Sequence, residues 1–530
     1  MKTKTLWLKD AGLSLACGVL ASLPLVLDTI PLLSFFLYIP YFLYLMAVIR
    51  ERSLRSLYLS GLFFYLGYYA GAFCFFSAMY PLDFAGLGVL GSVAVLFAAM
   101  LLLPLFQASF AAFSVVLLGV FAKRRWLPFP LAFSLASAAL FTLFATAQNL
   151  TWAGVPWASP AVGIASAPIL IQSASLLGSA FLCFLIFFVN AALAESFLLL
   201  RGCRDKAALL AFFCALCLFS VNLLSGGLLL TRKDTSERTL TVAVIQGNAP
   251  STEHSFLGTR LRRAMIEARE AAEKADVDLM LWSESFVQYD LLGDALLCEE
   301  FAALAKETGA MQVVGAFCKT DEGFYNALYL FTPDGEMSEE RYFKRRPVPF
   351  GEYVPWRAVF ETLIPPLTEI SILGRDIDAG DAPQVFHTEA GTLGGLICFD
   401  SIYPTLARTS TKAGAELLLL STDDSWFDGS YAKSLHLRHA VLRAVENGRS
   451  VVRTGNTGIS AVIDREGHLL AETLPDECTH AVATVSLHES GTPYTVMGEV
   501  FVALCIAFLF TLPVGVTLRG RKKQSSDSIK

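Results

Sequence analysis

Long apolar runs fill the first 231 residues of the chain, and a further run lies near its end. A helix of about 17 to 25 mostly apolar residues crosses the hydrocarbon core of a bilayer. The runs therefore predict a helical transmembrane bundle of about eight spans. These are 10–27, 30–49, 57–80, 87–121, 127–148, 166–199, 207–230 and 496–518.

Between these runs, residues 232–494 alternate short apolar strands with amphipathic helices, a pattern typical of a layered α/β domain. We expect strands at 240–248, 278–285 and 392–400 and from 415, and helices at 257–275, 293–308 and 433–447. The segments MQVVGAFCK and NALYLFTPDG are expected to pair as strands, closed by the turn Asp334–Gly335. The predicted domains are 1–231, 232–494 and 495–530.

Charge separates the membrane segments from the rest. The chain is 54% hydrophobic and only 17% charged, which excludes an ordinary soluble enzyme. Lysine and arginine cluster in alternate loops, and the positive-inside rule places those loops in the cytoplasm. Eight spans then leave both termini inside and residues 232–494 outside. That segment carries 24 Lys or Arg and 39 Asp or Glu, an acidity that argues against nucleic acid as a partner.

Three features of the membrane segments leave alternatives open. A cleaved signal peptide is an alternative reading of the first span, although no convincing small-residue cleavage site follows it. Gly67 and Gly71 form either a helix-packing site or a chance pair in a glycine-rich span. The uncharged loop 149–165, with Trp152 and Trp157, either anchors the chain at the membrane surface or forms part of a lipid-facing mouth.

The histidines and glycines indicate neither a metal site nor a cofactor. The sequence has no HExxH motif, and we expect His436 and His439 to be packed or solvated on a helix. It also has no phosphate-binding glycine loop. A disulfide within the acidic segment is compatible with an extracytoplasmic location. The cysteines available for it are Cys298, Cys318 and Cys478.

Three polar residues each follow an apolar run: Glu284, Lys344 and Cys398. A free thiol has a pKa of about 8.5 and is a weak nucleophile at neutral pH. We expect Glu284 to accept the thiol proton, and Lys344 to stabilise the thiolate and then the oxyanion of a tetrahedral intermediate. The backbone N–H of Phe399 would give that oxygen a second hydrogen bond. Taken singly, each of these residues is more often structural.

Longer motifs around these residues carry a family resemblance. They are VIQGN (244–248), VPFGEYVP (348–355), ICFDSIYP (397–404) and RAVENGRSVVRTGNTGISAVID (443–464). With them, residues 232–494 resemble the nitrilase, or carbon–nitrogen hydrolase, superfamily, whose αββα sandwich holds a Glu-Lys-Cys triad. The whole chain, with its eight predicted spans, resembles the bacterial apolipoprotein N-acyltransferase family.

The resemblance implies a role for each matching residue. Glu284 would be the general base, Lys344 would stabilise the oxyanion, and Cys398 would be the nucleophile. Glu352 would support this triad. Two aromatic residues would lie near the acyl-binding site, and these are Trp426 and Phe427.

The reaction that the resemblance implies is a two-step acyl transfer. Cys398 would take a fatty acyl chain from a membrane phospholipid as a thioester. It would then pass the chain to the α-amine of the diacylglyceryl-modified N-terminal cysteine of an apolipoprotein. The implied location is a bacterial inner membrane, with the catalytic domain in the periplasm. The sequence departs from the family pattern at Ser283, Phe399, Asp400 and Asp423, where Pro, Tyr, Glu and Asn are more usual.

Two rival functions are compatible with the same residues. A membrane-tethered amidase or nitrilase would act on small soluble substrates with the same triad, but a single anchoring span would suffice for it. A sensor or transporter with an inactive outer domain would leave the intact trio unexplained. The spans also show no series of ionisable residues that would mark an ion path.

Overall fold

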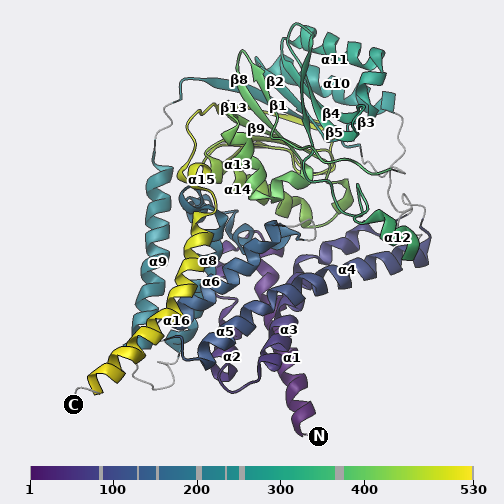
Figure 1. Ribbon diagram of the computed structural model, residues 1–530. Helices are drawn as coiled ribbons and strands as arrows, with labels where there is room; N and C mark the ends of the chain where they lie inside the picture. Colours follow the sequence, from purple (N-terminus) through teal and green to yellow (C-terminus); the bar gives the residue numbers. More distant parts are fainter. Residues whose placement is uncertain are drawn as a thin grey trace. The chain divides into compact units, whose positions relative to one another are not determined.

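The computed structural model describes residues 2–82, 87–127, 131–150, 154–197, 206–232, 236–249, 257–363 and 375–527. The chain divides into two compact units. One contains Met1–Phe76, Phe97–Thr231 and Glu499–Lys530, and the other contains Ser77–Leu96 and Arg232–Gly498. The first unit is helical, whereas the second contains all the described strands together with helices (Figure 1).

The helical unit is built from apolar helices. They are α1 (Lys2–Val26), α2 (Ile39–Val48), α3 (Leu54–Ala72), α4 (Val89–Ala111, which begins in the other unit), α5 (Phe113–Lys123), α6 (Ala132–Thr146), α7 (Pro168–Ile171), α8 (Ala174–Ser196), α9 (Lys206–Leu230) and α16 (Val500–Asp527).

Within the described residues, five helical stretches are long and apolar enough to cross a membrane. These are Leu8–Val26, Pro31–Val48, Val89–Lys123, Ala174–Ser196 and Ala208–Leu230. Helices α3, α6 and α16 lie at the other three predicted spans but do not reach the same length and hydropathy. The chain is therefore a membrane protein, and the predicted number of eight spans is approximate.

Close helix packing explains Gly67 and Gly71, which the sequence alone left as either a packing site or a chance pair. A β-carbon on Gly67 of α3 would lie 2.2 Å from the carbonyl oxygen of Leu15 on α1. One on Gly71 would lie 2.1 Å from Ser22 Oγ, also on α1. The pair therefore forms a helix-packing site.

The position of Trp157, in the aromatic loop before α7, disagrees with one of the two predicted roles of this loop, that of a surface anchor. Trp157 is 3% exposed, and its ring lies 5.6 Å from that of Phe75. It packs inside the helical unit, so it does not reach the lipid surface as an anchor would. Trp152 lies outside the described residues.

The second unit contains two β-sheets. The first has the strand order β13-β1-β2-β4-β5-β6, with β3 paired to β4, and the second has the order β12-β11-β10-β9-β8-β7. The strands of the first are β1 (Thr239–Gln246), β2 (Leu279–Trp282), β3 (Val287–Asp290), β4 (Met311–Lys319), β5 (Phe324–Phe331), β6 (Met337–Phe343) and β13 (Thr479–Ser486). Those of the second are β7 (Val385–Thr388), β8 (Gly391–Ile397), β9 (Leu417–Thr422), β10 (Ser450–Gly455), β11 (Ala461–Ile463) and β12 (Leu469–Glu472).

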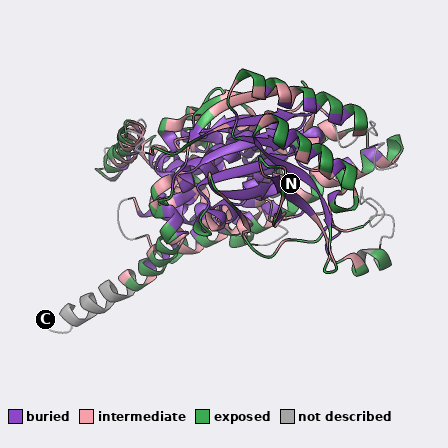
Figure 2. Ribbon diagram, turned by 90° about the horizontal axis from the view of Figure 1, so that it is seen from above, coloured by how far each residue is buried: buried purple, intermediate pink, exposed green. Residues whose placement is uncertain are grey.

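The two sheets are the inner layers of a four-layer sandwich. Val244 and Leu281 of the first sheet share one core with Leu417 and Val452 of the second. Helices α10 (Leu257–Lys274) and α11 (Ala295–Thr308) cover the outer face of the first sheet, and α13 (Pro404–Lys412) and α14 (Ala432–Asn447) pack on the second. Figure 2 shows the strands buried, while helices carry exposed residues. This αββα order confirms the predicted fold class.

The predicted helices of this unit are present as α10, α11 and α14, but the predicted turn was wrong. Asp334–Gly335 joins β5 to β6, and β4 and β5 are joined through residues 320–323. Both turns contain a glycine, so turn chemistry alone did not distinguish them. Gly335 has φ +77°, a conformation that favours glycine.

The prediction that Lys344 follows an apolar strand was also wrong. Strand β6, with the sequence MSEERYF, is mostly half-buried and polar. It stands last in the sheet order, where one strand edge is not covered by a neighbouring strand and polar residues are tolerated. The same weak apolar signal explains why the short strands β3, β7 and β12 were not predicted.

Candidate active site

The strand directions bring the three predicted site residues to one edge of the sandwich. Strands β1, β2 and β4 are mutually parallel, and so are β8, β9 and β10. Glu284 follows β2 and Cys398 follows β8. Strands β5 and β6 reverse direction in succession, so β6 again points the same way as β4 and Lys344 follows its end. The carboxyl ends of parallel strands are a common place for functional residues.

A tight turn positions Glu284 just after β2. Ser285 has φ +45°, and the N–H of Phe286 donates to the carbonyl oxygen of Ser283 at 3.3 Å. Strand β4 passes very close to this turn at Gly315. A β-carbon on Gly315 would lie 2.4 Å from the carbonyl oxygen of Ser283, so this strand position requires glycine.

Two carboxylates share the Lys344 ammonium in a buried cluster. Lys344 Nζ donates to Glu284 Oε1 at 2.7 Å and lies 2.8 Å from Glu352 Oε2. The Asn326 amide donates to Oε1 of both glutamates, at 2.8 Å for Glu284 and 3.3 Å for Glu352. Lys344 is 1% exposed and Glu284 is 6% exposed. Charged groups this deeply buried are tolerated when they are paired and hydrogen-bonded.

The second oxygen of Glu284 is held from the other sheet. The backbone N–H of Asp423, which directly follows β9, donates to Glu284 Oε2 at 3.0 Å. Glu284 therefore has hydrogen-bond donors from both sheets, and its orientation depends on how the two sheets pack.

The cluster shifts the pKa values of its members in a useful direction. Burial raises the pKa of Glu284 from an ordinary 4.5 to about 7, although the charge of Lys344 opposes this. Burial also acts to lower the pKa of Lys344, but the charges of Glu284 and Glu352 outweigh it and raise that pKa well above its usual value. Lys344 is therefore a fixed cation, and the pKa of Glu284 lies near neutrality, where general bases work best.

Cys398 begins the short 3₁₀ helix η10 (Cys398–Ile402), directly after β8, and its side chain is half-buried. It has φ +47°, a left-handed conformation that costs a residue with a β-carbon about 1–3 kcal/mol. Burial raises the pKa of its thiol well above the usual value, the charge of Glu284 adds to this, and Lys344 opposes it. The resting thiol is therefore protonated at neutral pH and needs a base to become a nucleophile.

The Asp400 carboxylate connects the Cys398 turn with the end of β6 and the residues around Lys344. It accepts the Tyr342 hydroxyl at 2.8 Å and the backbone N–H of Arg346 at 2.8 Å. It also accepts the N–H of Ile397, one residue before Cys398, at 3.1 Å. Asp400 is fully buried. Asp400 has a shorter side chain than the Glu that is more usual at this position. It nevertheless connects the Cys398 turn with the residues around Lys344.

The structure places the three aromatic residues of the prediction at the same edge without assigning them a role. Phe399 is buried, and its ring lies 5.5 Å from that of Tyr403 in an edge-to-face arrangement. Its predicted N–H donation to an oxyanion stays a prediction. Trp426 and Phe427 lie in the short helix η11 (Ser425–Phe427) after β9, and both are half-buried.

Sequence reasoning missed two residues of this site. Asn326 was read as part of an apolar strand, yet its amide bridges the two glutamates. His436 is packed on α14, one of its two expected states, but its contact with Cys398 was not predicted: Nε2 lies 3.2 Å from the Cys398 carbonyl oxygen. A signal for Asn326 was available, because a polar residue at the start of an antiparallel strand lies at the same sheet edge as the end of its parallel neighbours.

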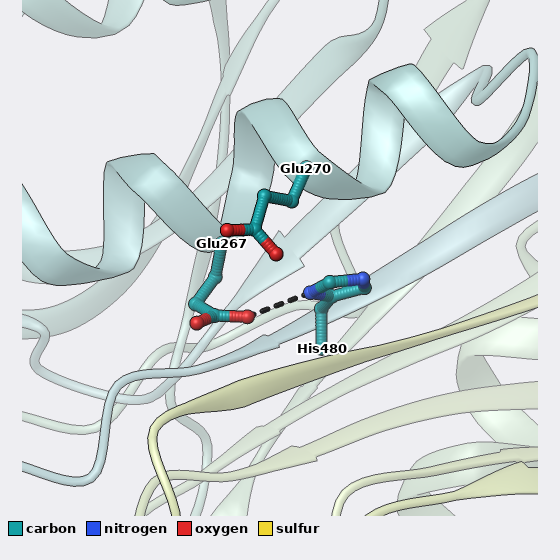
Figure 3. A group of neighbouring side chains, drawn as sticks. All are labelled: Glu267, Glu270 and His480. Atoms are coloured by element: carbon teal, nitrogen blue, oxygen red, sulfur yellow. Dashed lines mark hydrogen bonds and ion pairs between the residues drawn. The ribbon is translucent and has the colours of Figure 1, made fainter.

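A second titratable group lies apart from these residues. Among the described residues, Glu267 and Glu270 of α10 and His480 of β13 are close enough to hold a metal ion (Figure 3). His480 Nδ1 lies 2.7 Å from Glu267 Oε2, and the Lys274 ammonium lies 2.9 Å from Nε2. Both ring nitrogens thus already have hydrogen-bond partners, one of them a cation, so the geometry is that of an ion-pair network.

The three cysteines that the sequence left as candidates for a disulfide are not bonded to one another in the structure. Cys298, Cys318 and Cys478 are all free thiols. Burial raises the pKa of each, so they are protonated and unreactive at neutral pH.

Two family models match the chain in succession. The family described as apolipoprotein N-acyltransferase N-terminal domain matches residues 17–192, and the carbon–nitrogen hydrolase family matches residues 241–492. The second match contains the predicted triad, and the first covers most of the helical unit that precedes it.

Individual relatives give the same result. An apolipoprotein N-acyltransferase from Geobacter metallireducens is 33% identical over 273 residues, which are 50% of this chain and about half (51%) of that protein. One from Shewanella oneidensis is 27% identical and covers 80% of this chain and 81% of its own. One from Gloeobacter violaceus is 31% identical over 375 residues, 69% of either chain. This chain belongs to the apolipoprotein N-acyltransferase family.

Proposed function

We propose that this membrane protein transfers a fatty acyl chain from a phospholipid to the α-amine of the N-terminal diacylglyceryl-cysteine of apolipoproteins. The observation that carries the proposal is the buried, ion-paired set of Glu284, Lys344 and Glu352, whose charges act on the pKa of the Cys398 thiol. Membership of the family and the apolar helical stretches support a substrate that is held in a membrane.

In the first half-reaction, Glu284 accepts the proton of the Cys398 thiol. The thiolate attacks the ester carbonyl of the phospholipid, a C–S bond forms, and the carbonyl oxygen becomes an oxyanion stabilised by the Lys344 ammonium. The ester C–O bond then breaks, and the leaving oxygen of the lysophospholipid takes the proton from Glu284. The chain is left as a thioester on Cys398.

In the second half-reaction, the free amine of the apolipoprotein attacks the thioester. Glu284 accepts a proton from the amine, a C–N bond forms, and the C–S bond breaks. The thiolate of Cys398 then regains a proton from Glu284, so the enzyme returns to its starting state. Exclusion of water from the buried site suppresses hydrolysis of the thioester.

The same proposal includes a location. The catalytic unit would lie in the periplasm and both termini in the cytoplasm of a bacterial inner membrane, because the basic loops alternate with uncharged ones. A cysteine introduced at Glu322, in the turn between β4 and β5, tests this. We expect a membrane-impermeant maleimide to label it in cells whose outer membrane alone has been permeabilised. Labelling only after lysis of the inner membrane contradicts the orientation.

The transfer itself is tested with the full-length protein in detergent micelles and a phospholipid whose acyl chain is fluorescent. We expect the protein to become labelled through a hydroxylamine-sensitive bond and to pass the label to a diacylglyceryl lipopeptide with a free N-terminus. Cys398→Ala should abolish the label, whereas Cys478→Ala is the matched control and should keep it.

The rival functions give different outcomes in the same assay. Release of free fatty acid without transfer to the lipopeptide, together with hydrolysis of small amides, indicates an amidase. Absence of label in a folded wild-type protein indicates a non-catalytic role. Labelling that survives in Cys398→Ala contradicts the proposed nucleophile.

A further inference from the structure

The carbonyl group of the proposed nucleophile is held by side chains that the acyl-transfer chemistry does not use. The Cys398 carbonyl oxygen accepts the Ser401 hydroxyl at 2.8 Å and lies 3.2 Å from His436 Nε2. Ser401 and His436 also contact each other, at 2.9 Å. Both residues are fully buried. These contacts with the Cys398 carbonyl oxygen are therefore internal to the protein and do not form a surface for substrate.

His436 is itself fixed in place from behind. Its Nδ1 lies 2.7 Å from Asp424 Oδ1, and the other oxygen of Asp424 accepts from Arg453 at 2.6 Å. Burial acts to raise the pKa of Asp424, but the charges of Arg453 and His436 outweigh it and lower that pKa, so the carboxylate stays ionised. Gly458 makes room for it, since a β-carbon there would lie 2.1 Å from Asp424 Oδ2.

The hydrogen-bond partners in this network restrict which atoms can carry the protons. An ionised Asp424 requires the proton on Nδ1 of His436. Nε2 then either donates a hydrogen to the Cys398 carbonyl oxygen beside the Ser401 hydroxyl, or accepts the Ser401 hydroxyl proton, which in that state no longer lies on the carbonyl. In both states the ring bridges Asp424 and η10, so the position of the Cys398 turn follows the position of the ring.

We propose that His436 is a positioning residue that holds Cys398 in its left-handed conformation and so aims the thiol at Glu284 and Lys344. The proposal rests on the proposed function, because it concerns the same nucleophile. Its structural basis is the chain of contacts from Arg453 of β10, through Asp424 just after β9 and His436 of α14, to the Cys398 carbonyl.

Two consecutive residues make this arrangement specific. The backbone N–H of Asp423 holds Glu284, and the carboxylate of Asp424 holds His436. The end of β9 therefore sets the position of the base and, through the histidine, of the nucleophile. A misplacement of about 1 Å between reacting groups can cost about 100-fold in rate.

The test compares three full-length variants in detergent micelles with a fluorescent-acyl phosphatidylethanolamine. His436→Leu should slow single-turnover thioester formation about 30-fold at saturating lipid, while the half-saturating lipid concentration changes less than about twofold. His436→Gln, whose amide nitrogen can reach the position of Nε2, should recover the rate to within about fivefold. His439→Leu removes an equally buried imidazole from the same helix and should stay within about twofold of wild type.

A second readout does not depend on the acyl donor. Alkylation of Cys398 by iodoacetamide, followed by mass spectrometry, should be about tenfold slower in His436→Leu than in wild type. If phospholipid labels no protein but this difference in alkylation holds, the proposed function fails and the positioning role stands.

Two results overturn the positioning role: an unchanged rate in His436→Leu, or an equal loss in His439→Leu. If His436→Leu does not fold, Gln and Asn at position 436 are compared instead. The asparagine amide reaches only the position of Nδ1, so it should be about tenfold slower than glutamine. Equal rates for these two variants overturn the proposal as well.

Discussion

Replacing Lys344 with methionine would isolate the buried carboxylates at the centre of the site. Lys344 is 1% exposed and lies within 2.8 Å of both Glu284 and Glu352. Methionine keeps the length of the side chain but removes the charge. Removing one partner of a buried ion pair costs about 3–5 kcal/mol. For a domain of this size, about 1 kcal/mol corresponds to about 2–4 °C, so we expect Tm to fall by about 6–20 °C at about pH 8.5.

The fall in Tm caused by Lys344→Met should depend on pH, and the direction of this dependence follows from the pKa of Glu284. Without Lys344, the opposing charge is gone and the pKa of Glu284 rises above its value of about 7. A carboxyl group whose pKa is higher in the folded than in the unfolded protein destabilises the fold above its unfolded pKa. This destabilisation is relieved as the pH falls through the folded pKa. The deficit in Tm should therefore be smaller at about pH 6 than at about pH 8.5.

Thermal unfolding of the full-length protein in detergent, followed by tryptophan fluorescence at both pH values, measures this difference. The control is the double variant Lys344→Met/Glu284→Gln. It removes one of the two carboxylates that Lys344→Met leaves without their paired cation. It should be more stable than the single variant, by about 1–3 kcal/mol, because the two positions interact directly. A deficit that grows on acidification, or a double variant less stable than Lys344→Met, refutes the reasoning.

Three further predictions concern the same edge of the sandwich. Single-turnover thioester formation should rise with pH around a midpoint of about 7, because protonated Glu284 cannot accept the thiol proton, and Glu284→Gln should be inactive at every pH tested. Asp400→Asn should slow thioester formation at least about tenfold with little change in lipid affinity, because it weakens the charged hydrogen bonds to Tyr342 and to the Cys398 turn. Equal rates in this variant and in wild type would contradict the link between Asp400 and the turn. Gly315→Ala should lower the free energy of unfolding by about 1–3 kcal/mol, measured from Tm, because its β-carbon meets the Ser283 carbonyl; an unchanged Tm would show that the turn can move away.

The sequence predicted the layered fold and the strand ends of the site for a local reason. Apolar runs such as those before Glu284 and Cys398 are buried on both faces, so they are readable without knowledge of their neighbours. Strand β6 has no such signal because it lies at the end of its sheet. The position of Lys344 was therefore readable only from its surrounding motif.

The residues that sequence reasoning missed depend on long-range packing. His436 lies on a helix, and only the docking of α14 against the second sheet brings its ring to Asp424 and Cys398. Asn326 lies between Glu284 and Glu352, which are distant from it in the chain. The two adjacent acids that follow β9, Asp423 and Asp424, were visible in the sequence, but their separate partners were not.

The division of the site between the two sheets has a consequence for synthesis of the protein. Glu284 and Lys344 come from the first sheet, whereas Cys398 follows a strand of the second. The last strand of the first sheet, β13, is also the last strand of the domain to leave the ribosome. Until β13 has been made, the first sheet lacks the strand that pairs with β1, and β1 in turn pairs with β2, the strand that precedes Glu284. We therefore expect the Cys398 thiol to stay protonated and unreactive in the growing chain until both sheets are complete and packed together.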